Sequence, residues 1–590
     1  MALFLFRQPL PDDYPNRLVS PVAEGFSQPL RVRVLLGLLL ACLLPRVIVA
    51  ICIPSLTPDG TVYIEQARLL EGGNLVAGFK GMSIYPAILA AWHRLGTDWE
   101  LAAKIWGVSM ATLVVLPLYG WIRRQFDDRV ALVAGLLYIV HPKFIEMSPE
   151  AIRDQTFWFL FAGTLYAQWR AVVEIRLAWF LLAGVATALA CLTRFEGLYL
   201  FLPMGLWAVW RFGAVRDGRP RLVAGVGVFL AVLPAMVLAA NLVWRQAHGQ
   251  WLLPRLDPAL RAVVWLQGLA GRLPSDPSIP VTAAPPLSLA QMAWIFFPVM
   301  TRGLSPCFAL LMFGGLWKWR RVWARRDHQA MFWTAMVFVL GNWIQLWFDR
   351  QMCYRYALPI VLMASPFAAL GLLSLTIWLV GLVSRGPGSE ATETARRTNQ
   401  PALFRHLRRA AAWGPMAFVA AASLISAGLA VEKTHGPRRD AKTLGLWLYE
   451  QCGPGALIVG PAGLAPVTAH YAAARCEVFR RDLENADEVA DMVKRFQPQV
   501  ILVQTTRGLN REKCRGMVAR LATWGWTPVN LPLALHDRED LGVLLRRGGV
   551  SAWAESASSA AAESPPTRPA ASSQPQVLAE ERTARETLSR

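Results

Sequence analysis

The chain has 590 residues, of which 54% are hydrophobic and only 17% are charged. A soluble protein of this length would carry roughly a quarter charged residues. The net charge of +20 could suggest a nucleic-acid partner, but the arginines gather in short gaps between apolar runs, and no RNA-binding or zinc-ligand signature accompanies them. These features predict a multi-spanning membrane protein and argue against nucleic-acid binding.

The apolar runs predict about 11 membrane crossings of ~20 residues each. They lie near residues 33–53, 100–121, 130–147, 155–171, 177–193, 197–211, 222–243, 303–318, 330–348, 356–384 and 411–431. The loops after the even-numbered crossings are rich in arginine, which the positive-inside rule assigns to the cytoplasm. We therefore expect a multi-pass protein of the inner (cytoplasmic) membrane, with its N-terminus in the cytoplasm and the residues after 431 outside it.

Beyond residue 437 the pattern changes to helices that alternate with short apolar strands, such as ALIVG and QVILVQ. This alternation predicts a small α/β domain. The expected fold class is a multi-spanning α-helical membrane protein with a small C-terminal α/β extracytoplasmic domain. The expected parts are a cytoplasmic segment at 1–32, a transmembrane catalytic domain at 33–384, a cytoplasmic linker at 385–410, a last transmembrane helix at 411–431, the α/β domain at 437–548 and a disordered tail at 551–590.

The stretch 54–86 follows directly on the first apolar run, so Asp59 lies at the membrane edge, where a lone carboxylate needs a partner or a function. Tyr63 lies on one face of a short amphipathic helix, and Lys80 and Tyr85 lead back to the membrane. A carboxylate, a surface-lying helix and a cation at this boundary suit an enzyme that acts on a membrane-held substrate. The alternative is a tethering loop in which Asp59 caps the helix.

A second candidate site is the segment SPEAIRDQ, in which Glu150 and Asp154 would share a face if a helix begins near Ser148 and Pro149. Arg153 lies beside Asp154. Acidic residues at the mouth of a transmembrane helix are costly unless they are paired or hydrated, so they are functional candidates. The alternative is a first helical turn that favours acids through the helix dipole.

Two further segments place arginines between apolar runs. In LTRFEG, Arg194 and Glu196 could pair with each other, or with Asp154 or Asp59 from neighbouring helices. In RYALP, Arg355 precedes a long apolar run, where it could hold a phosphate by a bidentate contact. For both arginines, the alternative is an interfacial side chain that extends toward water.

Taken in order, DGxxYxxxAxxLxxG, SPExxRD, TRFEG and RYALP resemble the GT-C superfamily of membrane glycosyltransferases. The most similar branch is the group of lipid-linked-sugar transferases that includes the protein O-mannosyltransferases, the lipid A aminoarabinose transferases and the RgtA/B/C/D-like enzymes. The resemblance covers roughly residues 30–380 and rests on the order and common sidedness of these motifs.

The resemblance implies a polyprenyl-phosphate sugar donor and transfer to a hydroxyl group of a lipid, glycan or protein outside the cytoplasm. It places the first-loop catalytic acid at Asp59 and the second-loop acid at Asp154, with Glu150 nearby. An inverting single displacement with Asp59 as the base would follow. The candidate substrate-binding residues are Lys80, Tyr63, Tyr85, Arg153, Arg194, Glu196 and Arg355.

Asp59 is followed by Gly60 rather than by a second acid, which argues against a metal site of the DxD type. No metal ligands or cofactor are predicted, although dependence on a divalent metal stays open. The alternative functions are a transporter or flippase, or an O-antigen polymerase or ligase, for lipid-linked saccharides. A transporter predicts functional polar residues near the bilayer midplane and internal repeats, and the sequence shows neither.

Overall fold

The computed structural model describes most of the chain between residues 28 and 546. The described residues are 28–54, 56–78, 83–248, 288–318, 326–349, 352–384, 421–422, 424–429, 431–432, 438–479, 493, 495–504, 511–535 and 541–546. The predicted linker at 385–410, most of the predicted crossing at 411–431 and the tail at 551–590 lie outside them. The chain divides into two units, Met1–Arg439 and Asp440–Arg590, and each is described by itself.

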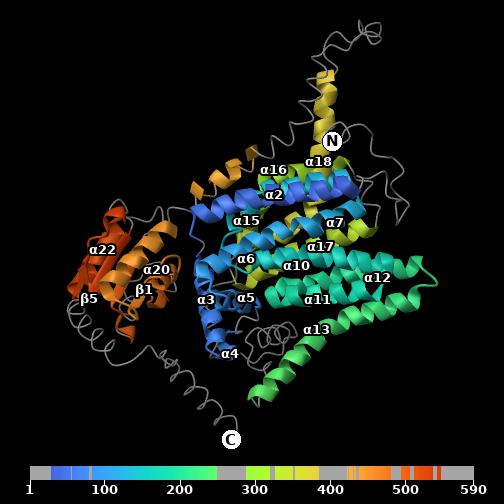
Figure 1. Ribbon diagram of the computed structural model, residues 1–590. Coiled ribbons are helices and arrows are strands. Elements are labelled where there is room, and N and C mark those ends of the chain that lie inside the picture. Colours follow the sequence, from blue (N-terminus) through green and yellow to red (C-terminus); the bar gives the residue numbers. More distant parts are fainter. Residues whose placement is uncertain are drawn as a thin grey trace. The chain divides into compact units, whose positions relative to one another are not determined.

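The first unit is a bundle of helices around one apolar core (Figure 1). Its longer helices are α2 (Gln28–Cys52), α6 (Trp99–Leu113), α7 (Val115–Gln125), α8 (Asp128–Val140), α10 (Asp154–Glu174), α11 (Leu177–Thr193), α12 (Phe201–Ala214), α13 (Arg219–His248), α15 (Leu289–Leu304), α16 (Pro306–Lys318), α17 (Arg326–Asp349) and α18 (Leu358–Ser384). Helix α10 packs against α6, α7, α11 and α12, so it forms the centre of the bundle. The predicted α-helical membrane fold is confirmed.

Within the described residues, five helices are long and apolar enough to cross a membrane, or six if a bent pair counts as one span. The five are Pro29–Cys52, Trp99–Gln125, Arg219–Leu242, His328–Trp347 and Tyr354–Thr376. The crossings predicted between residues 130 and 211 coincide with α8, α10, α11 and α12, which are shorter or more polar. The bent pair is α15 and α16, which meet at 87°. Ser305 at this break has a left-handed φ of 66°.

Short helices connect the long ones on the side of the candidate residues. They are α3 (Pro58–Glu71), α4 (Leu75–Gly78), α5 (Tyr85–Arg94), α9 (Pro142–Met147) and the 3-10 turns η1 (Phe195–Leu200) and η4 (Tyr354–Ala357). Two glycines, one in α3 and one in α6, allow these helices to approach the turn before α10 closely. A Cβ on Gly60 would lie 2.9 Å from the Cβ and carbonyl oxygen of Ala151, and one on Gly107 would lie 2.5 Å from the Ser148 carbonyl oxygen. The start of α3 and the turn before α10 are therefore held together by direct backbone packing.

If Asp59 takes part in a reaction, we expect Gly60→Ala to lower its rate by roughly 10²-fold, because a displacement of about 1 Å between α3 and the turn at Ala151 misplaces the side chains they carry. The matched control is Gly37→Ala in α2, where an added Cβ would meet nothing within 4 Å. Turnover and melting temperature in lipid would be measured for both variants. Equal turnover of Gly60→Ala and the wild type would show that this packing does not set the site.

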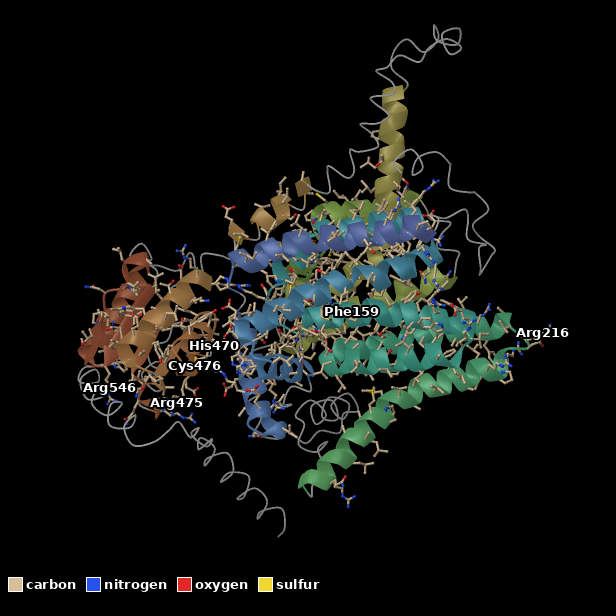
Figure 2. All side chains as sticks on the ribbon, viewed as in Figure 1. Phe159, Arg216, His470, Arg475, Cys476 and Arg546 are labelled. Carbon is tan, nitrogen blue, oxygen red and sulfur yellow. The ribbon has the colours of Figure 1, made fainter. Side chains whose placement is uncertain are left out.

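The second unit is a small α/β domain, as the sequence predicts. Its sheet has the order β2-β1-β3-β5-β4. The strands are β1 (Leu457–Pro461), β2 (Arg475–Phe479), β3 (Val500–Gln504), β4 (Trp526–Pro528) and β5 (Leu541–Arg546), with helices α20 (Ala465–Tyr471) and α22 (Arg511–Thr523). β1 pairs in parallel with β2 and β3, whereas β5 is antiparallel to β3 and β4. Figure 2 marks Arg475 and Cys476 on β2 and Arg546 at the end of β5.

The predicted strands ALIVG and QVILVQ are confirmed as β1 and β3, and RCEVF forms β2 between them in the sequence. The antiparallel strands β4 and β5 were not predicted. WTP is only three residues long, and LGVLLR lies between the charged segment HDRED and the paired Arg546 and Arg547, which obscure its apolar run. Cys452 and Cys476 of this unit carry free thiols.

Candidate active site

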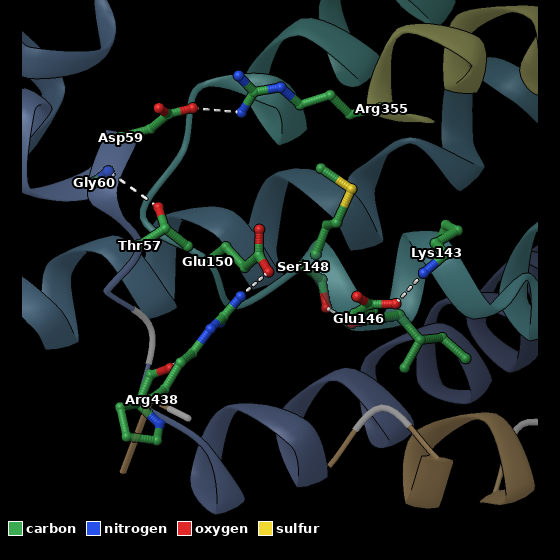
Figure 3. Close-up of polar contacts among 12 residues, drawn as sticks. Thr57, Asp59, Gly60, Lys143, Glu146, Ser148, Glu150, Arg355 and Arg438 are labelled. Carbon is green, nitrogen blue, oxygen red and sulfur yellow. Dashed lines mark hydrogen bonds and ion pairs between the residues drawn. The ribbon is translucent and has the colours of Figure 1, made fainter. Parts of the chain in front are cut away.

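Asp59 lies in the first turn of α3 and faces Arg355 of η4 (Figure 3). The Arg355 Nη1 donates to Asp59 Oδ2 at 2.6 Å. The helix is capped by Thr57 instead, whose hydroxyl accepts from the Gly60 amide at 3.0 Å. Asp59 is therefore not needed as a cap, and 46% of its side chain is exposed. The carboxylate is accessible to a bound molecule, and an arginine holds its position.

Arg194 links two carboxylates at the ends of neighbouring helices. It follows the last residue of α11, and its Nη1 donates to Asp154, the first residue of α10. Its Nη2 donates to Glu196 Oε1, and its Nε donates to Glu196 Oε2 at 3.2 Å. The side chains of Arg194 and Asp154 are only 5% and 2% exposed. The pairing of Arg194 with both acids, which the sequence left open, is confirmed.

Tyr356 joins these two ion-pair groups. The Arg194 guanidinium lies 4.9 Å from the centre of the Tyr356 ring, and that of Arg355 lies 5.7 Å from it. Asn342 of α17 donates to the Tyr356 carbonyl at 3.2 Å and fixes the turn that carries both residues. Contacts between a guanidinium and a ring face stabilise such clusters and leave the guanidinium hydrogens free for other acceptors. Among the described residues, Arg355 Nε is buried without a hydrogen-bond partner.

Two tyrosines form another wall of the same cluster. Tyr63 lies one turn after the acid of α3, with the Arg153 guanidinium 5.9 Å from its ring centre and the Tyr85 ring 5.4 Å away in an edge-on contact. The Ile84 amide donates to the Leu192 carbonyl at 2.9 Å and holds the start of α5 against the end of α11. Burial raises the pKa of Tyr63, so its hydroxyl stays protonated. Within the described part of the chain, the buried Tyr85 hydroxyl has no hydrogen-bond partner.

Glu150 belongs to a separate group of ion pairs (Figure 3). Arg438 Nη2 donates to Glu150 Oε1. Next to this pair, Lys143 Nζ lies 2.5 Å from Glu146 Oε2 and 4.4 Å from the centre of the Tyr354 ring. The Tyr354 hydroxyl donates to Glu146 at 3.4 Å. The turn η4 therefore presents neighbouring residues to two clusters, with Tyr354 in this one.

The helix expected near Ser148 begins at Asp154 instead, so Glu150 and Asp154 do not share a helical face. The physical reason is Gln155, whose buried side-chain amide donates to the carbonyls of Met147 and Glu150, the latter at 3.1 Å. These bonds hold the preceding residues in successive turns. Asp154 points to Arg194, whereas Glu150 points to the other cluster.

The structure thus brings most of the predicted site residues together. The residues of this cluster are Asp59, Tyr63, Tyr85, Arg153, Asp154, Arg194, Glu196 and Arg355. Lys80 lies outside the described residues. Tyr356, Gln155 and Arg438 were not among the residues predicted from the sequence. Tyr356 follows Arg355 in the RYALP motif. An aromatic ring next to this arginine was a sequence signal that could have identified Tyr356 as a site residue.

The pKa of Glu196, which lies outside the apolar spans, is the basis of a pH prediction. Burial alone would raise this pKa, but the charge and hydrogen bonds of Arg194 lower it below the usual 4.5. The unfolded chain then binds the proton more readily, so the pair stabilises the fold above about pH 4.5 and less as the pH falls through the folded-state pKa. We expect the difference in melting temperature between wild type and Glu196→Gln to be largest near pH 7 and to shrink below pH 4.5. A difference that grows on acidification would contradict this.

Part of the chain matches a known protein family, and its fold is similar to that of solved structures. Residues 83–244, which include Asp154, Arg194 and Glu196, match the family of dolichyl-phosphate-mannose-protein mannosyltransferases. The crystal structure of ArnT from Cupriavidus metallidurans bound to undecaprenyl phosphate is 14% identical with a TM-score of 0.53, covering 89% of this chain and 99% of ArnT. Its apo structure is 15% identical with a TM-score of 0.51, covering 84% of this chain and 95% of ArnT.

The chain has the fold of a GT-C membrane glycosyltransferase. The predicted resemblance to this superfamily is confirmed, and the family match indicates a glycosyltransferase. The oligosaccharyltransferase of Archaeoglobus fulgidus is also similar, at 15% identity and a TM-score of 0.45, covering 71% of this chain and 60% of that one. A search of curated proteins found no match.

Proposed function

We propose that the chain transfers a sugar from a polyprenyl-phosphate donor to a hydroxyl group of a lipid, glycan or protein acceptor. The observation that carries the proposal is the pair of Asp59 and Arg355, an accessible carboxylate and a cation at the end of apolar helices. Such a pair supplies a proton acceptor and a phosphate ligand within one site. The ArnT structure with the same fold is bound to undecaprenyl phosphate, which supports a lipid-phosphate donor.

The orientation in the membrane is part of the proposal. Helix α12 has 14 residues and so spans about 21 Å. Glu196 lies before its start, and Arg216 lies beyond its end, at the opposite side of the helical unit from α3 (Figure 2). If the arginine-bearing turn faces the cytoplasm, the candidate site faces the extracytoplasmic side. The reaction would then occur outside the cytoplasm, with the N-terminus inside.

In the proposed reaction, the acceptor oxygen attacks the anomeric carbon of the sugar as Asp59 takes its proton. The bond between that carbon and the phosphate oxygen breaks, and its electron pair stays on the leaving lipid phosphate. Arg355, whose Nε–H has no partner among the described residues, turns from Asp59 toward the phosphate and stabilises this charge. Lys80 is a further candidate for the phosphate. A single displacement of this kind inverts the anomeric configuration.

The buried group of Asp154, Arg194 and Glu196 has a positioning role in this scheme. Its charges are already paired with one another, so none of them is an obvious proton acceptor. Through Tyr356, the group fixes the turn that carries Arg355. Tyr63 supplies a ring face, and Tyr85 supplies a hydroxyl group without a partner in the described part of the chain; both groups are suited to a sugar.

The proposal is tested with purified protein in lipid, a panel of radiolabelled polyprenyl-phosphate sugars and membrane extract as the acceptor. We expect one donor to yield a labelled product whose anomeric configuration, read by NMR coupling constants, is opposite to that of the donor. Retention of configuration would rule out the single displacement. An unlabelled acceptor fraction with every donor would contradict the proposed function.

A further inference from the structure

Arg438 makes two contacts that connect distant parts of the first unit. Its Nη2 donates to the buried carboxylate of Glu150, and its Nη1 lies 3.4 Å from the Pro54 carbonyl oxygen. Arg438 is 288 residues from Glu150 in the sequence and 384 residues from Pro54. Only 17% of the Arg438 side chain and 8% of the Glu150 side chain are exposed. Both are charged groups removed from water, which is costly unless they are paired.

The two acceptors of Arg438 lie at the roots of the two loops that carry the candidate acids. Pro54 lies two residues after the end of α2 and five residues before Asp59. Glu150 lies in the turn before α10, four residues before Asp154. Arg438 itself lies in the first turn of a helix at 438–452, which continues into the second unit. One guanidinium therefore binds the roots of both loops.

We propose that Arg438 is a positioning residue that fixes the loops of Asp59 and Asp154 relative to each other through its bonds to Pro54 and Glu150. This inference rests on the proposed function, because it assigns Arg438 to the reaction at that site. Glu150 then acts as the anchor of the Arg438 side chain rather than as a catalytic acid. The sequence predicted Glu150 as a catalytic acid near Asp154. We assign it instead the role of holding the turn before α10 through its bond to Arg438.

The surrounding contacts support a role in geometry. Glu150 is already held by its backbone, because its carbonyl accepts from Gln155 at 3.1 Å and from the Ile152 amide at 2.8 Å. A bond to its carboxylate therefore fixes the whole turn rather than a free side chain. Gly60 packs directly on Ala151 of the same turn. A shift of this turn would pass to α3 and to Asp59.

The experiment compares wild type, Arg438→Met, Glu150→Gln and the double variant in lipid, with Arg439→Gln as the control, because Arg439 is the exposed neighbour. We expect Arg438→Met to lower kcat by roughly 10-fold or more with little change in KM for the donor, since misplaced groups slow the chemical step. The Arg439→Gln variant should match the wild type.

The double variant separates positioning from the cost of an unpaired buried charge. If the single variant fails only because Glu150 is left charged and alone, the double variant will regain wild-type kcat. A positioning role requires kcat to stay low, because neither loop is held. Recovery in the double variant, or an unchanged kcat in Arg438→Met, would overturn the inference.

Hydrogen–deuterium exchange gives a readout that does not need activity. Exchange of the peptides that cover 56–62 and 147–157 should be faster in Arg438→Met and in the double variant than in Arg439→Gln. Unchanged exchange would overturn the role of Arg438 even in an active enzyme. If the wild type transfers no sugar, the proposed function fails, and the exchange data still decide whether Arg438 holds the two loops.

Discussion

Asp59→Asn is expected to lower kcat for sugar transfer by about 10²–10⁴-fold. The amide cannot accept the acceptor's proton, whereas it fills the same space beside Arg355. Because the helix is capped by Thr57, the substitution leaves the cap bond to Gly60 intact. Binding of the lipid-phosphate donor should therefore change little, which separate measurements of kcat and donor Kd would show.

Glu65→Gln is the matched control for this variant. Glu65 lies on the same helix, its side chain is 61% exposed, and its partner is Arg68 at 3.6 Å. It should retain full activity. Full transfer activity in a folded Asp59→Asn protein would show that another group takes the proton.

Arg194→Met is expected to have the second large effect, on stability as well as on activity. It leaves the carboxylates of Asp154 and Glu196 without their common cation, and Asp154 is almost fully buried. Breaking a buried ion pair by removing one partner costs about 3–5 kcal/mol. The protein should melt at a clearly lower temperature in lipid and lose activity during incubation.

Arg176→Met serves as the comparison for the loss of an arginine. Arg176 also precedes an apolar helix, but its side chain is 72% exposed and lies 3.9 Å from Glu174. A surface ion pair of this kind contributes at most about 1 kcal/mol. If the Arg194 and Arg176 variants melted at the same temperature, the ion-pair group at Asp154 would not be a structural centre of the site.

The helical fold could be predicted because apolar runs of sufficient length have few alternatives in a membrane protein. The first residue of α10 could not be predicted, because it depends on the hydrogen bonds from the Gln155 side chain to the carbonyls of Met147 and Glu150. Such a contact of one side chain with nearby carbonyls leaves no periodic signal in the sequence. The bend at Ser305 could not be predicted either, because neither Ser305 nor Pro306 alone distinguishes a break of 87° between two helices from a simple loop.

Most residues of the candidate site could be named from the sequence, but the contacts between them could not. The sequence indicated three candidate site residues, Asp59, Arg194 and Arg355, because charged groups at a membrane edge need partners. Which partner each one takes depends on how helices pack, and sequence spacing does not determine that. Arg438 shows the limit most clearly, because it pairs with a residue 288 positions away. It was expected only as part of an outer domain.

The most direct test of the account uses the purified protein in sealed vesicles with a radiolabelled polyprenyl-phosphate sugar and an acceptor on the outer face only. We expect the label to move covalently from the lipid to the acceptor and the free lipid phosphate to accumulate in equal amount. If the labelled lipid instead crossed between the leaflets with its sugar still attached, the protein would be a transporter of lipid-linked sugars, and the assignment of Asp59 as a base would be contradicted.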